Sequence, residues 1–183
     1  KSKDELNELD VFVLEFTRLL ERHTPYVIVG GYISILFGRA RATEDIDLFI
    51  QPLSRETFLA FYQELKQQGY WCLNAEASDE VYSYLTDGLS VRFAKQNETI
   101  PNFEVKFARK PLDREALHDV LKVVTAGGTL RISSLERQIA FKRYFLRSDK
   151  DLEDAAHIEE VFKKNLDFRK IEEYRRKILH ETA

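Results

Sequence analysis

A strand, a glycine pair and a helix follow one another directly at residues 26–38, and this order constrains the fold most. The apolar YVIV at 26–29 is typical of a short buried strand, and YISILFG predicts a helix that ends at Gly38. Gly30 and Gly31 permit a sharp turn and let backbone N–H groups approach a ligand closely. Such a turn before a helix N-terminus favours phosphate binding. The alternative is an ordinary tight turn.

Two aspartates one residue apart follow the glycine pair. DIDLFI at 45–50 alternates polar and apolar residues, which predicts a strand with Asp45 and Asp47 on one face and a core on the other. Two carboxylates this close repel each other unless a cation lies between them, which makes them candidate ligands for Mg²⁺ or Mn²⁺. A solvated strand face with two surface acids is the alternative.

A third carboxylate lies on a later strand with the same pattern. In NFEVKFA at 102–108, Glu104 and Lys106 face one way and the apolar residues face the other. We therefore take Glu104 as the candidate third ligand of a two-metal site that acts on a triphosphate. The alternative is that this face carries only surface ion pairs.

The predicted elements change in character near residue 110. Residues 3–22 and 55–68 predict amphipathic helices, and we expect strands in YWCLN, VYSYL, LSVRFA and NFEVKFA between 70 and 108. Beyond residue 110 the patterns predict helices, with a short segment around 119–132 left unassigned; the helices are 112–121, 134–147, about 149–163, and 167–180. The sequence thus predicts an α/β lobe over residues 1–110 and a mostly helical lobe over 111–183, which together can form one compact unit.

Composition excludes several classes of protein. The 183 residues are 44% hydrophobic and 32% charged, which is globular and sufficient for a core. The net charge of -3 provides no overall basic field for nucleic acid, although a local basic patch remains open. No apolar run approaches the ~20 residues of a transmembrane helix, so we expect no membrane-spanning segment and no membrane partner. The lone Cys72 favours a reducing compartment, and hence a cytoplasmic location.

These motifs resemble the signature of the polymerase-β-type nucleotidyltransferase superfamily, in which an apolar residue and a glycine pair precede Asp-apolar-Asp and a later acid. The matching residues are Val29-Gly30-Gly31, Asp45-Ile46-Asp47 and Phe103-Glu104-Val105. RATEDID at 41–47 is similar to one branch, the abortive-infection (AbiEii-like) toxin nucleotidyltransferases and related minimal proteins. A helical segment of that branch resembles residues that lie further on: Lys142, Lys150, Asp151 and Asp154. The resemblance covers about residues 26–162.

The resemblance implies an α/β (α+β) fold, with a mixed-sheet nucleotidyltransferase lobe followed by a helical C-terminal lobe. It also implies transfer of a nucleoside monophosphate from an NTP to an acceptor hydroxyl, with release of pyrophosphate. The implied catalytic and metal-binding residues are Asp45, Asp47 and Glu104, and those implied to hold the triphosphate are Gly30, Gly31, Arg41 and Lys142. The acceptor can be RNA such as a tRNA 3′ end, a protein or a small molecule such as an aminoglycoside, and the branch implies a possible antitoxin partner.

The roles of several charged residues stay open at this point. Arg39 can bind triphosphate or an acidic acceptor, or belong to a solvated loop. Lys142 can reach phosphate from the helical lobe or extend its amine to solvent. Asp151 and Asp154 share a helix face. Acids in a first turn compensate the helix dipole, which is the role we favour for Asp154.

Two functions of other classes also fit the sequence. The superfamily usually has Asp where Glu104 stands, and the extra methylene leaves room for a catalytically weak nucleotide-binding or interaction module of the same fold. A plain α/β binding protein with surface acids is the third interpretation. It predicts that no metal binds at Asp45 and Asp47.

Overall fold

A mixed sheet of eight strands forms the centre of the computed structural model, which describes residues 2–3 and 5–182. Its strand order is β1-β7-β8-β2-β3-β6-β5-β4. The strands are β1 (Ser2–Lys3), β2 (Tyr26–Val29), β3 (Asp45–Ile50), β4 (Tyr70–Cys72), β5 (Val91–Lys95), β6 (Asn102–Phe107), β7 (Val120–Thr125) and β8 (Gly128–Ser133).

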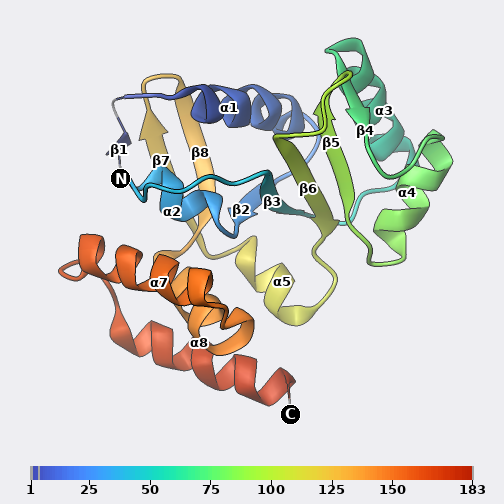
Figure 1. Ribbon diagram of the computed structural model, residues 1–183. Coiled ribbons are helices and arrows are strands. Elements are labelled where there is room, and N and C mark those ends of the chain that lie inside the picture. Colours follow the sequence, from blue (N-terminus) through green and yellow to red (C-terminus); the bar gives the residue numbers. More distant parts are fainter. Residues whose placement is uncertain (1, 4, 183) are drawn as a thin grey trace.

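Helices surround this sheet (Figure 1). They are α1 (Glu8–Glu21), α2 (Tyr32–Leu36), α3 (Arg55–Gln67), α4 (Ser78–Thr86), α5 (Pro111–Ala116), α6 (Leu135–Phe141), the π-helix η1 (Lys142–Leu146), α7 (Asp149–Phe162) and α8 (Phe168–Glu181). Several begin at a side chain that accepts a hydrogen bond from a backbone N–H of the first turn, which satisfies a donor that the helix leaves free. These N-caps are Asn7, Ser54, Ser134, Ser148 and Asp167.

The middle of the sheet sets the register of the acidic strands. β3 lies antiparallel to β2 on one side and parallel to β6 on the other. The parallel register places Asp47 opposite Glu104 and Ile46 opposite Phe103. Because side chains alternate across a strand, the acids of both strands share one face and the apolar residues share the other.

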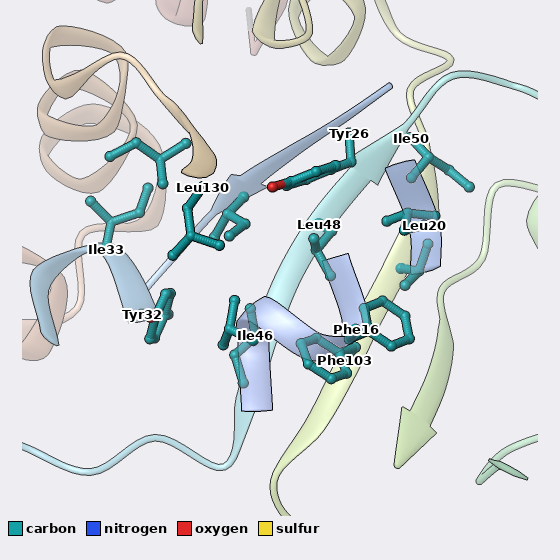
Figure 2. Close-up of a cluster of buried hydrophobic side chains, with 14 of the residues drawn as sticks. Phe16, Leu20, Tyr26, Tyr32, Ile33, Ile46, Leu48, Ile50, Phe103 and Leu130 are labelled. Atoms are coloured by element: carbon teal, nitrogen blue, oxygen red, sulfur yellow. The ribbon is translucent and has the colours of Figure 1, made fainter. Parts of the chain in front are cut away.

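The apolar face packs under α1. Ile46, Leu48 and Phe103 are fully or almost fully buried beside Phe16 and Leu20 of that helix (Figure 2). Phe16 stacks on Phe103 with 3.9 Å between ring centroids. Burial of this face fixes the strand register, because a slip of one residue would place the acids in the core.

The C-terminal helices lie away from α1. Figure 1 shows α1 at the top of the view and α7 and α8 at the bottom, with the strands between them. α6 contacts both α7 and α8, and α7 also contacts α2 next to the glycine pair. The structure confirms the predicted α/β class, the mixed sheet and the helical C-terminal part.

Residues 81–85, VYSYL, were expected as a strand, and that prediction is wrong. They lie in α4, where Val81 and Leu85 are buried one helical turn apart and Asp79 and Glu80 occupy the first turn. β-branched and aromatic residues favour strands, but burial of the spaced apolar pair and acids at the helix start override that preference.

The unassigned segment 119–132 contains most of a hairpin. β7 and β8 pair antiparallel, and β8 continues the sheet through a parallel pairing with β2. The sheet therefore takes strands from both sides of residue 110, and the division into two lobes stays a prediction.

The predicted helix ends differ modestly from those observed. The helix expected at 3–22 is α1, Glu8–Glu21, and residue 4 of that span lies outside the described residues. The helix expected at 112–121 ends earlier, as α5 at Ala116. The expected helix 134–147 is α6 followed by η1. None of the helices within residues 2–3 and 5–182 combines the length and apolar character needed to cross a lipid bilayer.

Candidate active site

Three carboxylates converge on the face of the sheet opposite α1. Asp45 and Asp47 of β3 and Glu104 of β6 each offer an oxygen, and these oxygens all lie within 4.8 Å of one another. The adjacent parallel strands produce this cluster directly, because Asp47 and Glu104 occupy paired positions. The structure thus brings together the three acids that the sequence proposed, and their catalytic role stays a prediction.

Repulsion within this cluster is concentrated on Asp47. Burial, the negative charges of Asp45 and Glu104, and a hydrogen bond to Glu104 raise its pKa from 3.8 to about 7, against a smaller opposing effect of Arg92. A carboxyl group in this position carries a proton over much of the acidic pH range. A cation placed among the three oxygens would remove the penalty on the ionised form.

Arg92 and Ser90 also contact the cluster, and the sequence reasoning did not identify either. The Arg92 guanidinium of β5 lies 3.8 Å from an oxygen of Asp45 and 3.4 Å from one of Glu104. The hydroxyl of Ser90 donates to Glu104 at 3.0 Å. The available signal was Arg92 between apolar Val91 and Phe93, which places it on the acidic face of a strand.

Gly30 lies directly against Asp47. Its φ is +81°, a conformation that favours glycine, and a Cβ at this position would overlap the Asp47 carboxylate. Its carbonyl accepts a hydrogen bond of 2.7 Å from Nε2 of Gln138 in α6. Position 30 therefore has to be glycine, and the hydrogen bond from α6 holds the turn in place.

Gly31 provides room for an arginine. A Cβ here would overlap the guanidinium of Arg41, so Arg41 lies across the glycine turn. Its Nε and Nη2 donate to the two oxygens of Asp154 in α7 at 3.0 and 2.9 Å. Arg41 thus joins the turn to the helical part of the protein.

Asp154 is the centre of a buried ionic cluster. Its side chain is fully buried, and it binds Arg41, Arg39 and the Nζ of Lys142, the last at 2.8 Å. Burial raises the pKa of Asp154, but hydrogen bonds from Arg41, Lys142 and Arg39 outweigh that effect and lower it to about 2. The favoured assignment of Asp154 to helix-dipole compensation is wrong, because it lies beyond the first turn and neutralises three cations.

Asp151 has both a capping and a pairing role. It forms a capping box with Ser148 at the start of α7, and its other oxygen accepts from Lys142 at 3.2 Å. Lys142 itself is only 2% exposed and does not extend to solvent. Arg39 contacts Glu153 and Asp154 and donates to the carbonyl of Lys150 at 3.1 Å, which excludes a freely solvated loop position.

A cleft of about 860 Å³ opens from this cluster toward the C-terminal helices. Gly30, Asp47 and Glu104 line it on the sheet side, and Gln138 and Lys142 line it on the α6 side. The rest of the wall mixes apolar, basic and acidic side chains. They include Phe107, Leu112, Phe141, Phe145, Leu146, Lys106, Arg109, Lys110, Arg137, Asp87, Asp113 and Glu181.

Comparison with protein families agrees with this arrangement. The family described as "Nucleotidyl transferase of unknown function (DUF2204)" matches residues 8–182. The chain belongs to this nucleotidyltransferase family. The motifs quoted from the sequence therefore lie in a member of that family, while membership in the AbiEii-like branch stays a hypothesis. No curated protein sequence matches the chain.

Solved structures of similar shape include antibiotic nucleotidyltransferases. One is ANT(2″)-Ia in complex with adenylyl-2″-tobramycin, with 19% identity, a TM-score of 0.59, and coverage of 94% of this chain and 98% of that one. The lincosamide antibiotic adenylyltransferase LnuA, bound to lincomycin, has 13% identity, a TM-score of 0.57, and coverage of 86% and 99%. JHP933 from Helicobacter pylori has 18% identity, a TM-score of 0.50, and coverage of 91% and 72%. At these identities the likeness shows the fold alone.

The donor set of this nucleotidyltransferase suits a divalent cation. Asp45, Asp47 and Glu104 provide hard oxygen ligands of the type that Mg²⁺ and Mn²⁺ prefer. Burial and the charges of Asp45 and Glu104 raise the pKa of Asp47, and a cation among the three oxygens would favour its ionised form. The residues therefore fit the metal that the resemblance implies.

Proposed function

We propose that this protein transfers a nucleoside monophosphate from an NTP to an acceptor hydroxyl, with the help of Mg²⁺ or Mn²⁺. The observation that carries the proposal is the convergence of Asp45, Asp47 and Glu104 against Gly30, at the end of a large cleft. Membership in a nucleotidyltransferase family supports the same reaction.

The three carboxylates would hold the metal. Asp45 and Asp47 share one face of β3, separated by Ile46, and Glu104 completes the set from the neighbouring strand. A cation held there would supply positive charge that stabilises the negative charge of the reacting phosphate. Arg92 neutralises part of the charge on Asp45 and Glu104 and orients both side chains.

The reaction is a displacement at the α-phosphorus of the NTP. The acceptor oxygen forms a new bond to this phosphorus, and the bond from the phosphorus to the bridging oxygen of the leaving pyrophosphate breaks. The hydroxyl proton passes to the carboxylate of Glu104, which Ser90 and Arg92 hold in orientation. The products are the nucleotidylated acceptor and pyrophosphate.

The triphosphate would lie along the glycine turn. Gly30 and Gly31 leave space beside Asp47 and Arg41, and Arg41 and Lys142 supply positive charge. Both cations are bound by Asp154, which fixes their positions before a nucleotide arrives. Preorganised charges of this kind stabilise a phosphoryl group without reorganisation during the reaction.

A catalytically weak nucleotide-binding module is the second candidate function. The hydrogen bonds of the Lys142 amine to Asp151 and Asp154 support this candidate, because the amine would have to give up those partners to bind phosphate. The longer Glu104 side chain supports it as well. This candidate predicts metal-dependent NTP binding without turnover.

Three classes of acceptor have to be distinguished by experiment. Two of the similar structures contain adenylyl-2″-tobramycin and lincomycin, which supports a small-molecule hydroxyl as the acceptor. RNA, including a tRNA 3′ end, and a protein hydroxyl are the others. An AbiEii-like toxin role with an antitoxin partner rests on RATEDID and on the segment from Lys142 to Asp154.

The test uses each of the four NTPs with label on the α-phosphate. The protein is incubated with Mg²⁺ and, separately, with total RNA, cell protein, or a panel of aminoglycosides and lincosamides. An Asp45→Ala/Asp47→Ala double variant serves as the inactive control, and Asp79→Ala, in an exposed pair with Arg55, as the matched active control. We expect label in one acceptor class that disappears only in the double variant.

Binding measurements decide between the two candidate functions. NTP·Mg²⁺ binding that requires Asp45 and Asp47, without label in any acceptor class, favours the weak module. If wild type and double variant bind NTP·Mg²⁺ equally poorly, the metal-site assignment is refuted.

A further inference from the structure

Arg137 of α6 is a buried cation in the wall of the cleft. Its side chain is only 3% exposed, and its Nε is a buried donor without a hydrogen-bond partner. Within residues 2–3 and 5–182, no oxygen accepts a hydrogen bond from its guanidinium, and no carboxylate lies within 4.0 Å of it. Its guanidinium carbon lies 3.9 Å from the centroid of the Phe141 ring.

The acids whose charges act on Arg137 do not form an ion pair with it within 4.0 Å. Asp119 is already bound by Lys170 and Tyr174, each at 2.5 Å, and Glu115 is bound by Lys177 at 2.5 Å. Burial raises the pKa of Asp113, while the charge of Arg137 lowers it, and the two side chains form no ion pair within 4.0 Å. Burial also lowers the pKa of Arg137, against the charges of Asp113, Asp119 and Glu115. A buried guanidinium without a hydrogen-bonded anion is costly to the fold, and an anionic ligand would offset that cost.

Arg137 lines the same cleft as the carboxylate cluster but points away from the triphosphate-binding cations. Lys142, the first residue of η1, pairs with Asp151 and Asp154 of α7. Arg137 of α6 instead stacks on Phe141, which contacts Tyr174 of α8. The two cations therefore lie toward different helices, Lys142 toward α7 and Arg137 toward α8.

Basic, apolar and acidic side chains share the rest of the cleft lining, the acids being Asp87, Asp113 and Glu181. Lys106, Arg109 and Lys110 are exposed on the wall formed by β6 and the segment after it, and Phe145 is 54% exposed on the facing wall. Glu104, the proposed base for the acceptor hydroxyl, lies on β6 two residues before Lys106. An acceptor that approaches Glu104 from this side meets the basic residues first.

We propose that Arg137 binds an oxyanion, a phosphate or carboxylate group, on the acceptor substrate. The proposal rests on the proposed transferase function and specifies the acceptor: it carries a negative charge near the hydroxyl that is modified. The planar guanidinium matches such a group with two parallel N–H···O bonds, and Phe141 holds the plane in place. A cationic group at this position would instead repel the Arg137 guanidinium.

The first measurement uses the wild-type protein, with sulfate as the probe and EDTA present to remove divalent metal. The Nε–Hε NMR signal of Arg137 is followed during titration with sodium sulfate, with sodium chloride at equal ionic strength as the reference. We expect a saturable shift with sulfate that chloride does not produce. Absence of a saturable shift overturns the proposal.

The second measurement separates binding from structural roles. In chloride buffer, we expect Arg137→Met to melt at the same temperature as wild type or higher, because the variant removes an unpaired buried charge. Sulfate should raise the melting temperature of wild type more than that of Arg137→Met. Arg143→Met is the matched control, because Arg143 pairs with Glu159 outside the cleft lining, and it should keep the full sulfate effect. A large loss of stability in Arg137→Met in chloride would assign the guanidinium a structural role and overturn the proposal.

A third arm distinguishes the acceptor from the nucleotide as the source of the anion. Arg137→Met should bind NTP·Mg²⁺ with an affinity within about twofold of wild type, whereas loss of a direct phosphate contact would weaken it by about tenfold or more. The larger loss would assign Arg137 to the nucleotide and refute the acceptor assignment. The sulfate titration needs neither metal nor turnover, so its failure is separate from failure of the transferase proposal.

Discussion

Replacement of Asp47 by asparagine is expected to stabilise the protein at neutral and alkaline pH. Burial and the charges of Asp45 and Glu104 raise the Asp47 pKa from 3.8 to about 7. One pKa unit corresponds to about 1.4 kcal/mol, so ionisation of Asp47 in the folded state costs about 4 kcal/mol. Asparagine is nearly isosteric, stays neutral, and can donate to the neighbouring carboxylates.

The sign of the pH dependence follows from proton binding. Between about pH 4 and pH 7 the folded state holds a proton on Asp47 that the unfolded state has lost, so the free energy of unfolding falls as pH rises through this window. Above about pH 7 the folded state bears the full cost of ionising Asp47, and below about pH 4 it bears none of it. The free energy of unfolding of Asp47→Asn should therefore be about 2–4 kcal/mol higher than that of wild type near pH 8, allowing for relaxation of the site. Near pH 4 the two values should be equal.

Urea denaturation of both proteins across this pH range, with EDTA present, measures the difference directly. Asp87→Asn, which alters an exposed acid, is the control and should show no such trend. Addition of Mg²⁺ at high pH should stabilise wild type and leave Asp47→Asn unaffected. A wild type as stable as Asp47→Asn near pH 8 without metal would refute the electrostatic reasoning.

Three further predictions concern neighbouring residues. Gly30→Ala should abolish nucleotidyl transfer in the labelled-NTP assay, because its Cβ would overlap the Asp47 carboxylate at a φ of +81°; retained activity would contradict the assignment of the turn. Asp154→Asn should lower the free energy of unfolding by about 3–5 kcal/mol in urea titrations, because it leaves buried cations without their counter-charge. Glu104→Gln should reduce kcat by a factor of about 10²–10⁴ and leave NTP·Mg²⁺ affinity within a few-fold, a split that a purely structural role would not produce.

Local patterns were sufficient for the acidic strands. The alternation in DIDLFI and NFEVKFA predicted both strands and the face that carries Asp45, Asp47 and Glu104, because a strand with one buried face has only one acceptable register. The same reasoning failed for VYSYL, because its strand-favouring residues are also compatible with a helix. There the burial of Val81 and Leu85, one helical turn apart, favours the helix.

The ionic cluster around Asp154 shows why other parts of the site were out of reach. Asp154 lies 113 positions from Arg41 in the chain, and no periodic pattern links them. Arg92 likewise reaches the carboxylates only because β5 pairs with β6. Long-range pairing of charges depends on how the layers assemble, which short-range sequence patterns do not encode.

The sequence alone determined the glycine turn, the identity of the three carboxylates and the faces on which they stand, since these follow from backbone conformation and strand periodicity within a few residues. The tertiary structure alone decided that Asp154 neutralises Arg41, Arg39 and Lys142, and that the Nε of Arg137 is buried without a hydrogen-bond partner among the described residues. The physical reason is desolvation: whether a charge needs a partner depends on what covers it, and the covering residues come from distant parts of the chain.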